Sequence, residues 1–146
     1  MVERIYQELE APVEFREEGE APTGHGEVDV TYSHTMDSGT IRVRRIGSDT
    51  SAEIRRARRD LIDVTGAEHV TVEIPLAQSG AASLADAAES DGFFFCGIIP
   101  SYSEDGDTLL LQYLHTPLDI GKIQVANEFA RELVDYADRE RARVSR

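Results

Sequence analysis

Several residue types are scarce in this sequence of 146 residues, and each shortage excludes a class of protein. The single cysteine, Cys96, cannot form a disulfide within the chain, and a lone thiol is typical of a reducing compartment. No apolar run approaches the roughly 20 residues that a membrane span requires, and the amino-terminal residues lack the apolar core of a secretory signal. We therefore expect a cytoplasmic protein.

Basic residues are also scarce, because 15 Lys and Arg face 28 Asp and Glu, for a formal net charge of -13. Binding to nucleic acid or to an anionic membrane needs clustered cations, so neither partner is expected. A strongly acidic surface repels itself in dilute buffer, and salt screens that repulsion. The composition therefore favours a halophilic protein from a salt-accumulating cytoplasm over an acidic protein from an ordinary cell.

Metal ligands are sparse as well. The four histidines show no His-x-His or His-x-x-x-His spacing, and Cys96 cannot supply a ligand pair, so no metal site is expected. Cys96 stands directly after three phenylalanines, which predicts a buried core thiol.

Hydrophobic periodicity predicts one domain. It divides the chain into a connector helix over 2–10, an acidic linker over 17–26, a core over 28–114 and a long helix over 119–143. The core is expected to contain strands at 28–32 and 40–46, a helix at 51–64, a strand at 70–74, a helix at 80–91, and strands at 93–99 and 109–114. This order predicts an α+β (mixed α/β) fold, with a mixed central sheet and helices on both faces.

Two local patterns add detail to this prediction. Thr50 and Glu53 have the spacing of a capping box at the start of a helix. The run 93–99 is almost continuously apolar, which predicts a strand buried on both faces.

A family resemblance rests on the stretch from Ala85 to Gly97, in which a helix of small residues ends in Gly92-Phe93 and the next strand runs on to a glycine. This stretch, with the order of elements around it, resembles the GNAT acetyltransferase superfamily over residues 28–114. The run from Gly92 to Pro100, followed by Leu109 to Leu114, is most similar to a subgroup that often forms the C-terminal module of larger regulatory proteins. The resemblance implies a GNAT-like fold, acetyl-CoA as a cofactor and N-acetyl transfer as an activity.

In that superfamily an Arg/Gln-x-x-Gly-x-Gly/Ala loop opens a helix and holds the CoA pyrophosphate. The matching stretch here runs from Arg44 to Ser51, so the resemblance implies cofactor contacts from Arg44, Arg45, Gly47 and Ser48. The last small position is Asp49, whose carboxylate would oppose a bound phosphate. The alternative interpretation, which we prefer, is that Asp49 and its neighbours Thr50 and Ser51 cap a helix.

Candidate catalytic residues are fewer. The resemblance places Glu73 where some members have a general base, while its alternation with Thr71 indicates an outward-facing strand residue, which we favour. Tyr102 or Tyr113 could protonate a leaving thiolate, or could be rim residues with a hydrated hydroxyl group.

Two functional hypotheses follow. The chain is either an acetyl-CoA-dependent N-acetyltransferase or a degenerate GNAT-like module that binds a ligand or a partner protein without catalysis. Asp49 and the single glycine of the loop favour the second. We also expect a possible homodimer through the C-terminal helix or an edge strand, and we consider the chain a candidate C-terminal portion of a longer regulatory protein.

Overall fold

The structure, a computed structural model, describes residues 1–145. Five strands form one mixed sheet in the order β1-β2-β3-β5-β4, in which only the β2–β3 pair is parallel. The strands are β1 (Glu27–Ser33), β2 (Ser38–Arg45), β3 (His69–Pro75), β4 (Phe94–Ser103) and β5 (Gly106–Leu114). The expected α+β class is confirmed.

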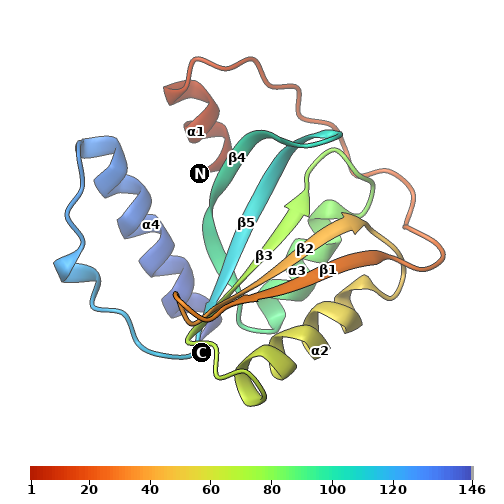
Figure 1. Cartoon of the computed structure of the whole chain (residues 1–146). Helices are drawn as coiled ribbons and strands as arrows, with labels where there is room; N and C mark the ends of the chain where they lie inside the picture. Colours follow the sequence, from red (N-terminus) through yellow and green to blue (C-terminus); the bar gives the residue numbers. More distant parts are fainter. Residues whose placement is uncertain (146) are drawn as a thin grey trace.

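Four α-helices accompany the sheet (Figure 1): α1 (Val2–Glu8), α2 (Thr50–Asp63), α3 (Ala81–Ser90) and α4 (Glu128–Val144). Helices α2 and α3 pack next to β1, β2 and β3, whereas α1 and α4 lie on the β4 side of the molecule. Within residues 1–145, no helix combines the length and the apolar character that crossing a bilayer requires.

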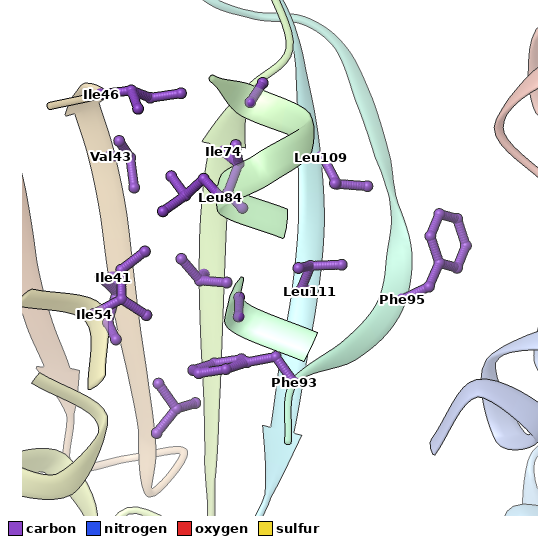
Figure 2. Packing of buried hydrophobic residues seen from close by; sticks show 14 of the residues in the cluster. Ile41, Val43, Ile46, Ile54, Ile74, Leu84, Phe93, Phe95, Leu109 and Leu111 are labelled. Atoms are coloured by element: carbon purple, nitrogen blue, oxygen red, sulfur yellow. The ribbon is translucent and has the colours of Figure 1, made fainter. Parts of the chain in front are cut away.

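The core explains why these segments take these shapes. Alternate residues of β2, Ile41 and Val43, enter one apolar cluster with Ile54 of α2 and Leu84 of α3, and Phe93 joins it with no exposed surface (Figure 2). The period-2 and period-3.6 apolar patterns thus meet in one cluster, as a sheet covered by amphipathic helices requires.

The predicted start of the last helix, at residue 119, is wrong, because the observed helix begins at Glu128. Residues Ile120–Lys122 form a short 3-10 turn, in which Asp119 accepts a hydrogen bond from the Gly121 N–H, and the backbone is extended at Ile123. Helix α4 starts only after Asn127, whose side chain accepts from the Ala130 N–H at 2.8 Å. A local Asx turn and an asparagine cap therefore prevail over the apolar periodicity that continued upstream.

The expectation that residues 93–99 are buried on both faces is also wrong. Strand β4 lies at the edge of the sheet, and beyond Phe95 its residues are half-buried or exposed. Cys96 stands at an irregularity in the β4–β5 pairing and is exposed, with its Sγ donating to Gln112 Oε1 at 3.4 Å. The expected buried core thiol is therefore wrong, although desolvation around the sulfur still raises the pKa of this thiol.

Residues 18–26, here called the strap, are irregular and acidic but pack against the domain. Glu18 accepts hydrogen bonds from the backbone N–H and the hydroxyl of Ser83, in the first turn of α3. Ser79 donates to the carbonyl oxygen of Glu20. The strap thus supplies a cap for a helix more than 60 residues away, and it leads directly into β1.

Candidate functional site

The parallel strands β2 and β3 separate at one end of the sheet. Their register runs from Ser38 opposite His69 to Arg42 opposite Glu73, and the last residues of β2 have no partner on β3. The Gln78 side chain fills this gap: its Oε1 accepts from the Ile46 N–H at 2.9 Å, and its Nε2 donates to the Arg44 carbonyl at 2.8 Å. A side-chain amide thus pairs the groups that a neighbouring strand would otherwise satisfy.

A guanidinium, a carboxylate and a phenol meet where the two strands separate. Arg42 Nε donates to Glu73 Oε2 at 2.5 Å, and a terminal nitrogen of Arg42 donates to the Tyr102 hydroxyl. Glu73 shares a sheet face with Arg42, as its alternation with Thr71 indicated, but it is only 8% exposed, so it is not a solvent-exposed strand residue. Burial is tolerated because the cross-strand neighbour Arg42 supplies the opposite charge, and the hydrogen bond to Glu73 raises the pKa of the guanidinium further.

This arrangement limits what Glu73 and Tyr102 can do. A general base needs an oxygen lone pair that faces the proton to be removed, and one Glu73 oxygen is already engaged by Arg42. Tyr102 is 46% exposed and accepts from the same arginine. The structure therefore brings two of the three candidate catalytic residues together through Arg42, which sequence reasoning had not assigned to a site.

The third candidate, Tyr113, lies elsewhere. It pairs with Val70, three residues before Glu73 on β3, and its ring lies beneath the Arg58 guanidinium at 4.6 Å. Nothing in the structure links Tyr113 to Glu73 or Tyr102.

The β2–α2 loop (residues 46–49) is where a pyrophosphate site is implied by the resemblance, and the amides of its first three residues are already in use. Ile46 N–H donates to Gln78, Gly47 N–H donates to the Thr50 hydroxyl at 2.8 Å, and Ser48 N–H donates to the Gly24 carbonyl at 2.9 Å. The expected capping box is absent, because Thr50 lies inside α2 and its buried side chain binds the loop. Asp49 is the N-cap residue but makes no side-chain bond to its own helix.

The Asp49 carboxylate instead holds the end of the strap. Oδ1 accepts from the Gly26 N–H at 2.7 Å, and Oδ2 lies 2.7 Å from His25 Nδ1. The hydrogen bond with Asp49 raises the pKa of His25, and the Gly26 N–H lowers the pKa of Asp49. The Asp49 carboxylate therefore supplies a negative charge at this loop, and the backbone amide of Gly26 and the side chain of His25 bind it.

The backbones of the strap and of the β2–α2 loop lie in direct contact at Gly47. A Cβ added to Gly47 would lie 2.6 Å from the Gly24 oxygen and 2.5 Å from the carbonyl carbon of His25. Only glycine fits such an approach, because every atom it meets belongs to the backbone.

The two basic candidates of the loop are paired on the protein surface. Arg44 Nε donates to Asp29 Oδ2 of β1 at 2.7 Å, while Arg45 Nε donates to the His25 carbonyl at 3.4 Å and lies 3.8 Å from Glu27.

These contacts test whether CoA fits the residues implied for it. A bound pyrophosphate needs free amides and open space at the loop, whereas strap residues 24–26 cover the loop and Asp49 adds a negative charge. The residues as they stand do not fit the group. Sequence reasoning missed the strap because nothing in an acidic, glycine-containing linker indicates where it packs.

Among residues 1–145, no group of three His, Cys, Asp or Glu side chains could hold a metal ion.

Comparisons with known proteins concern the fold. No family model and no curated protein matches the sequence. Similar solved structures include a mutant of spermidine N-acetyltransferase from Vibrio cholerae, with 12% identity and a TM-score of 0.48, covering 62% of this chain and 56% of that one. They also include the N-terminal domain of a ribosomal-protein-alanine acetyltransferase from Clostridium acetobutylicum, with 15% identity and a TM-score of 0.47, covering 62% of this chain and 73% of that one. A third is a ribosomal-protein-S5-alanine acetyltransferase from Vibrio fischeri, with 13% identity and a TM-score of 0.46, covering 62% of this chain and 54% of that one.

These similarities concern the general arrangement of the chain. This chain spans little more than half the length of the spermidine acetyltransferase that it matches. The observed order of strand, helix, strand, helix and two antiparallel strands after β1 is the one that the GNAT resemblance implied.

Proposed function

We propose that this chain is a GNAT-like domain that does not bind CoA at the β2–α2 loop and that serves as a regulatory module for a ligand or a partner protein. One observation carries the proposal. The amides of Ile46, Gly47 and Ser48 are bonded to protein atoms, and strap residues 24–26 cover the loop.

Titration with acetyl-CoA and with CoA, followed by thermal unfolding in molar KCl, tests this proposal. A ligand present at 100 times its dissociation constant stabilises a protein by about 2.7 kcal/mol, which would raise the melting temperature of a chain this size by roughly 5 to 10 °C. We expect no saturable rise with millimolar ligand. A saturable rise in the wild-type protein that Arg44→Ala or Arg45→Ala abolishes, and that the surface variant Arg59→Ala preserves, would contradict the proposal.

A second variant separates two causes of non-binding. The double change His25→Ala with Asp49→Ser removes the His25–Asp49 contact and the Asp49 acceptor of the Gly26 N–H, and with them the negative charge at the loop. If this variant gains CoA binding, the Asp49 charge and its contacts with the strap are the block; if it does not, the block lies in the remaining contacts of the strap or in the loop itself.

An active acetyl-CoA-dependent N-acetyltransferase is the alternative. The observation in its favour is that Glu73 and Tyr102 share Arg42 at the point where β2 and β3 separate. Release of free CoA thiol in the presence of a panel of amines, lost in Glu73→Gln and Tyr102→Phe, would establish this activity.

The setting of the protein belongs to the same proposal. We place it in a salt-rich cytoplasm because of its charge of -13, and we expect unfolding midpoints to rise with KCl concentration. A homodimer would form through an edge of the sheet, either β1 or β4, or through α4. Light scattering at high salt measures it directly.

A further inference from the structure

A cavity of about 490 Å³ lies at the opposite end of the sheet from the β2–α2 loop. Tyr113 and Leu114 line it at the end of β5, opposite the start of β3, whereas the loop follows the end of β2. Six residue steps of β2, from Gly39 beside Val70 to Arg45, separate the two ends by about 20 Å. The cavity is therefore a second site, and its volume is that of a small-molecule pocket.

Arg58 of α2 is the unusual residue of this cavity. Its Nε is the one buried side-chain nitrogen or oxygen atom without a hydrogen-bond partner among the described residues. The guanidinium makes no ion pair within residues 1–145, although the chain carries a net charge of -13. A buried donor without an acceptor is costly, so an unpaired one in a native fold calls for an explanation.

The guanidinium is held in place rather than left to move. It lies over the Tyr113 ring at 4.6 Å, and the Gly92 backbone lies close to the edge of that ring, since an added Cβ would stand 3.2 Å from Tyr113 Cε2. Tyr113 and His115 also line the cavity, and neither side chain has a hydrogen-bond partner within the described residues. Three side-chain groups that can donate hydrogen bonds thus border one cavity without an acceptor.

The other charges that line the cavity are already paired. Asp91 receives two hydrogen bonds from Arg55 Nε, both at 2.9 Å, and Arg141 donates to Asp138 at 2.6 Å. Among the described residues that line the cavity, Arg58 is therefore the charge without an ion-pair partner, and it is positive. The remaining wall is partly apolar, from Phe94, Pro117 and Val144.

We propose that this cavity binds a small organic anion whose carboxylate or phosphate head pairs with Arg58, Tyr113 and His115 and whose apolar body lies against Phe94, Pro117 and Val144. A planar guanidinium that is fixed by stacking is suited to an oxyanion, because it loses little freedom on binding. This site does not depend on whether CoA binds at the other end of the sheet.

Nuclear magnetic resonance titration of the full chain tests the site, with phenyl phosphate, benzoate, inorganic phosphate and the neutral analogue benzyl alcohol as probes. We expect saturable shifts of the Arg58 Nε–H and of backbone amides at 90–92 and 113–115 with at least one of the two aryl anions. Benzyl alcohol should bind at least tenfold more weakly, because it offers no charge to the guanidinium. The stronger of phenyl phosphate and benzoate identifies the head group, and inorganic phosphate reports the contribution of the head alone.

Variants make the test specific. Arg58→Gln should weaken the stronger aryl anion at least tenfold, and Tyr113→Phe, which keeps the ring, should weaken it several-fold. Arg59→Gln is the matched control, because it removes an equal charge from an exposed neighbour on the same helix and should change affinity less than twofold. Each variant is first shown to be folded by circular dichroism.

Two results would overturn the proposal. One is the absence of any saturable shift with millimolar aryl anions in the folded wild-type protein, in both low and molar KCl. The other is binding that Arg58→Gln and Arg59→Gln weaken equally, since that pattern indicates general charge attraction.

Discussion

Gly47→Ala is the sharpest perturbation of the contact between the strap and the β2–α2 loop. The new Cβ would meet backbone atoms of residues 24–26, including the Gly24 oxygen at 2.6 Å, and no flexible side chain is present to yield. Overpacking of this kind costs about 1–3 kcal/mol. The alternative is release of the strap, which gives up the Ser48 and Gly26 hydrogen bonds at about 1 kcal/mol each and regains chain freedom. Because the response with the lower free-energy cost is the one that occurs, we expect the free energy of unfolding to fall by about 2 kcal/mol.

Urea unfolding followed by circular dichroism measures this loss, and Gly97→Ala is the control. Gly97 lies within strand β4, where an added Cβ meets nothing within 4 Å. We expect Gly97→Ala to stay within about 0.5 kcal/mol of the wild-type protein.

The titration of His25 gives a second reading of the same variant. Asp49 holds the pKa of His25 above 6.5 and its own pKa lies below 3.8. The contact between His25 and Asp49 therefore contributes fully to folding stability between about pH 3.8 and pH 6.5. This contribution is lost when the pH falls through the lowered pKa of Asp49, and also when the pH rises through the raised pKa of His25. Release of the strap in Gly47→Ala should return the pKa of His25 to its ordinary value. Unchanged stability together with an unchanged His25 titration would refute the reasoning, because the strap and the loop would then not touch.

Three further predictions concern other parts of the fold. Gln78→Ala removes three hydrogen bonds and leaves the Ile46 N–H without a partner, so urea unfolding should show a loss of about 2–3 kcal/mol. Burial and then the hydrogen bond to Asp107 raise the pKa of Tyr6 from 10.0 to about 12. The protonated Tyr6 hydroxyl therefore contributes fully to stability below pH 10, and this contribution is lost as the pH rises toward 12. In an ultraviolet titration one tyrosine should ionise late, and Tyr6→Phe should remove that step. Phe93→Ala empties a fully buried site and should cost about 3–5 kcal/mol in the same unfolding assay.

The sequence predicted those elements whose periodicity agrees with their final packing. Helix α2 follows from the spacing of Ile54 and Leu61, and both residues are buried against the sheet. The start of α4 was misplaced because the apolar pattern upstream of Glu128 is opposed by local turn chemistry at Asp119 and Asn127, which periodicity does not weigh.

The candidate site was harder to predict because its properties come from pairs of distant residues. Glu73 alternates with Thr71 as an exposed strand residue would, and only the register of β2 on β3 reveals that Arg42 stands beside it. Asp49 was correctly noted as a carboxylate in an unusual place. Its partners, His25 and Gly26, stand 24 and 23 residues away in a segment with no periodic pattern, so their docking could not be derived.

The strap has a consequence for hydrogen exchange. No residue of the strap is buried, and the strap contributes no side chain to the apolar cluster, so hydrogen bonds at the rim of the domain are its main attachment. Segments of that kind open by local fluctuation at a free energy far below that of global unfolding. The amides of Gly26 and Ser48 should therefore exchange with deuterium together and early, while those of β3 exchange late. The rate of that shared opening is the rate at which the β2–α2 loop is exposed to anything dissolved around it.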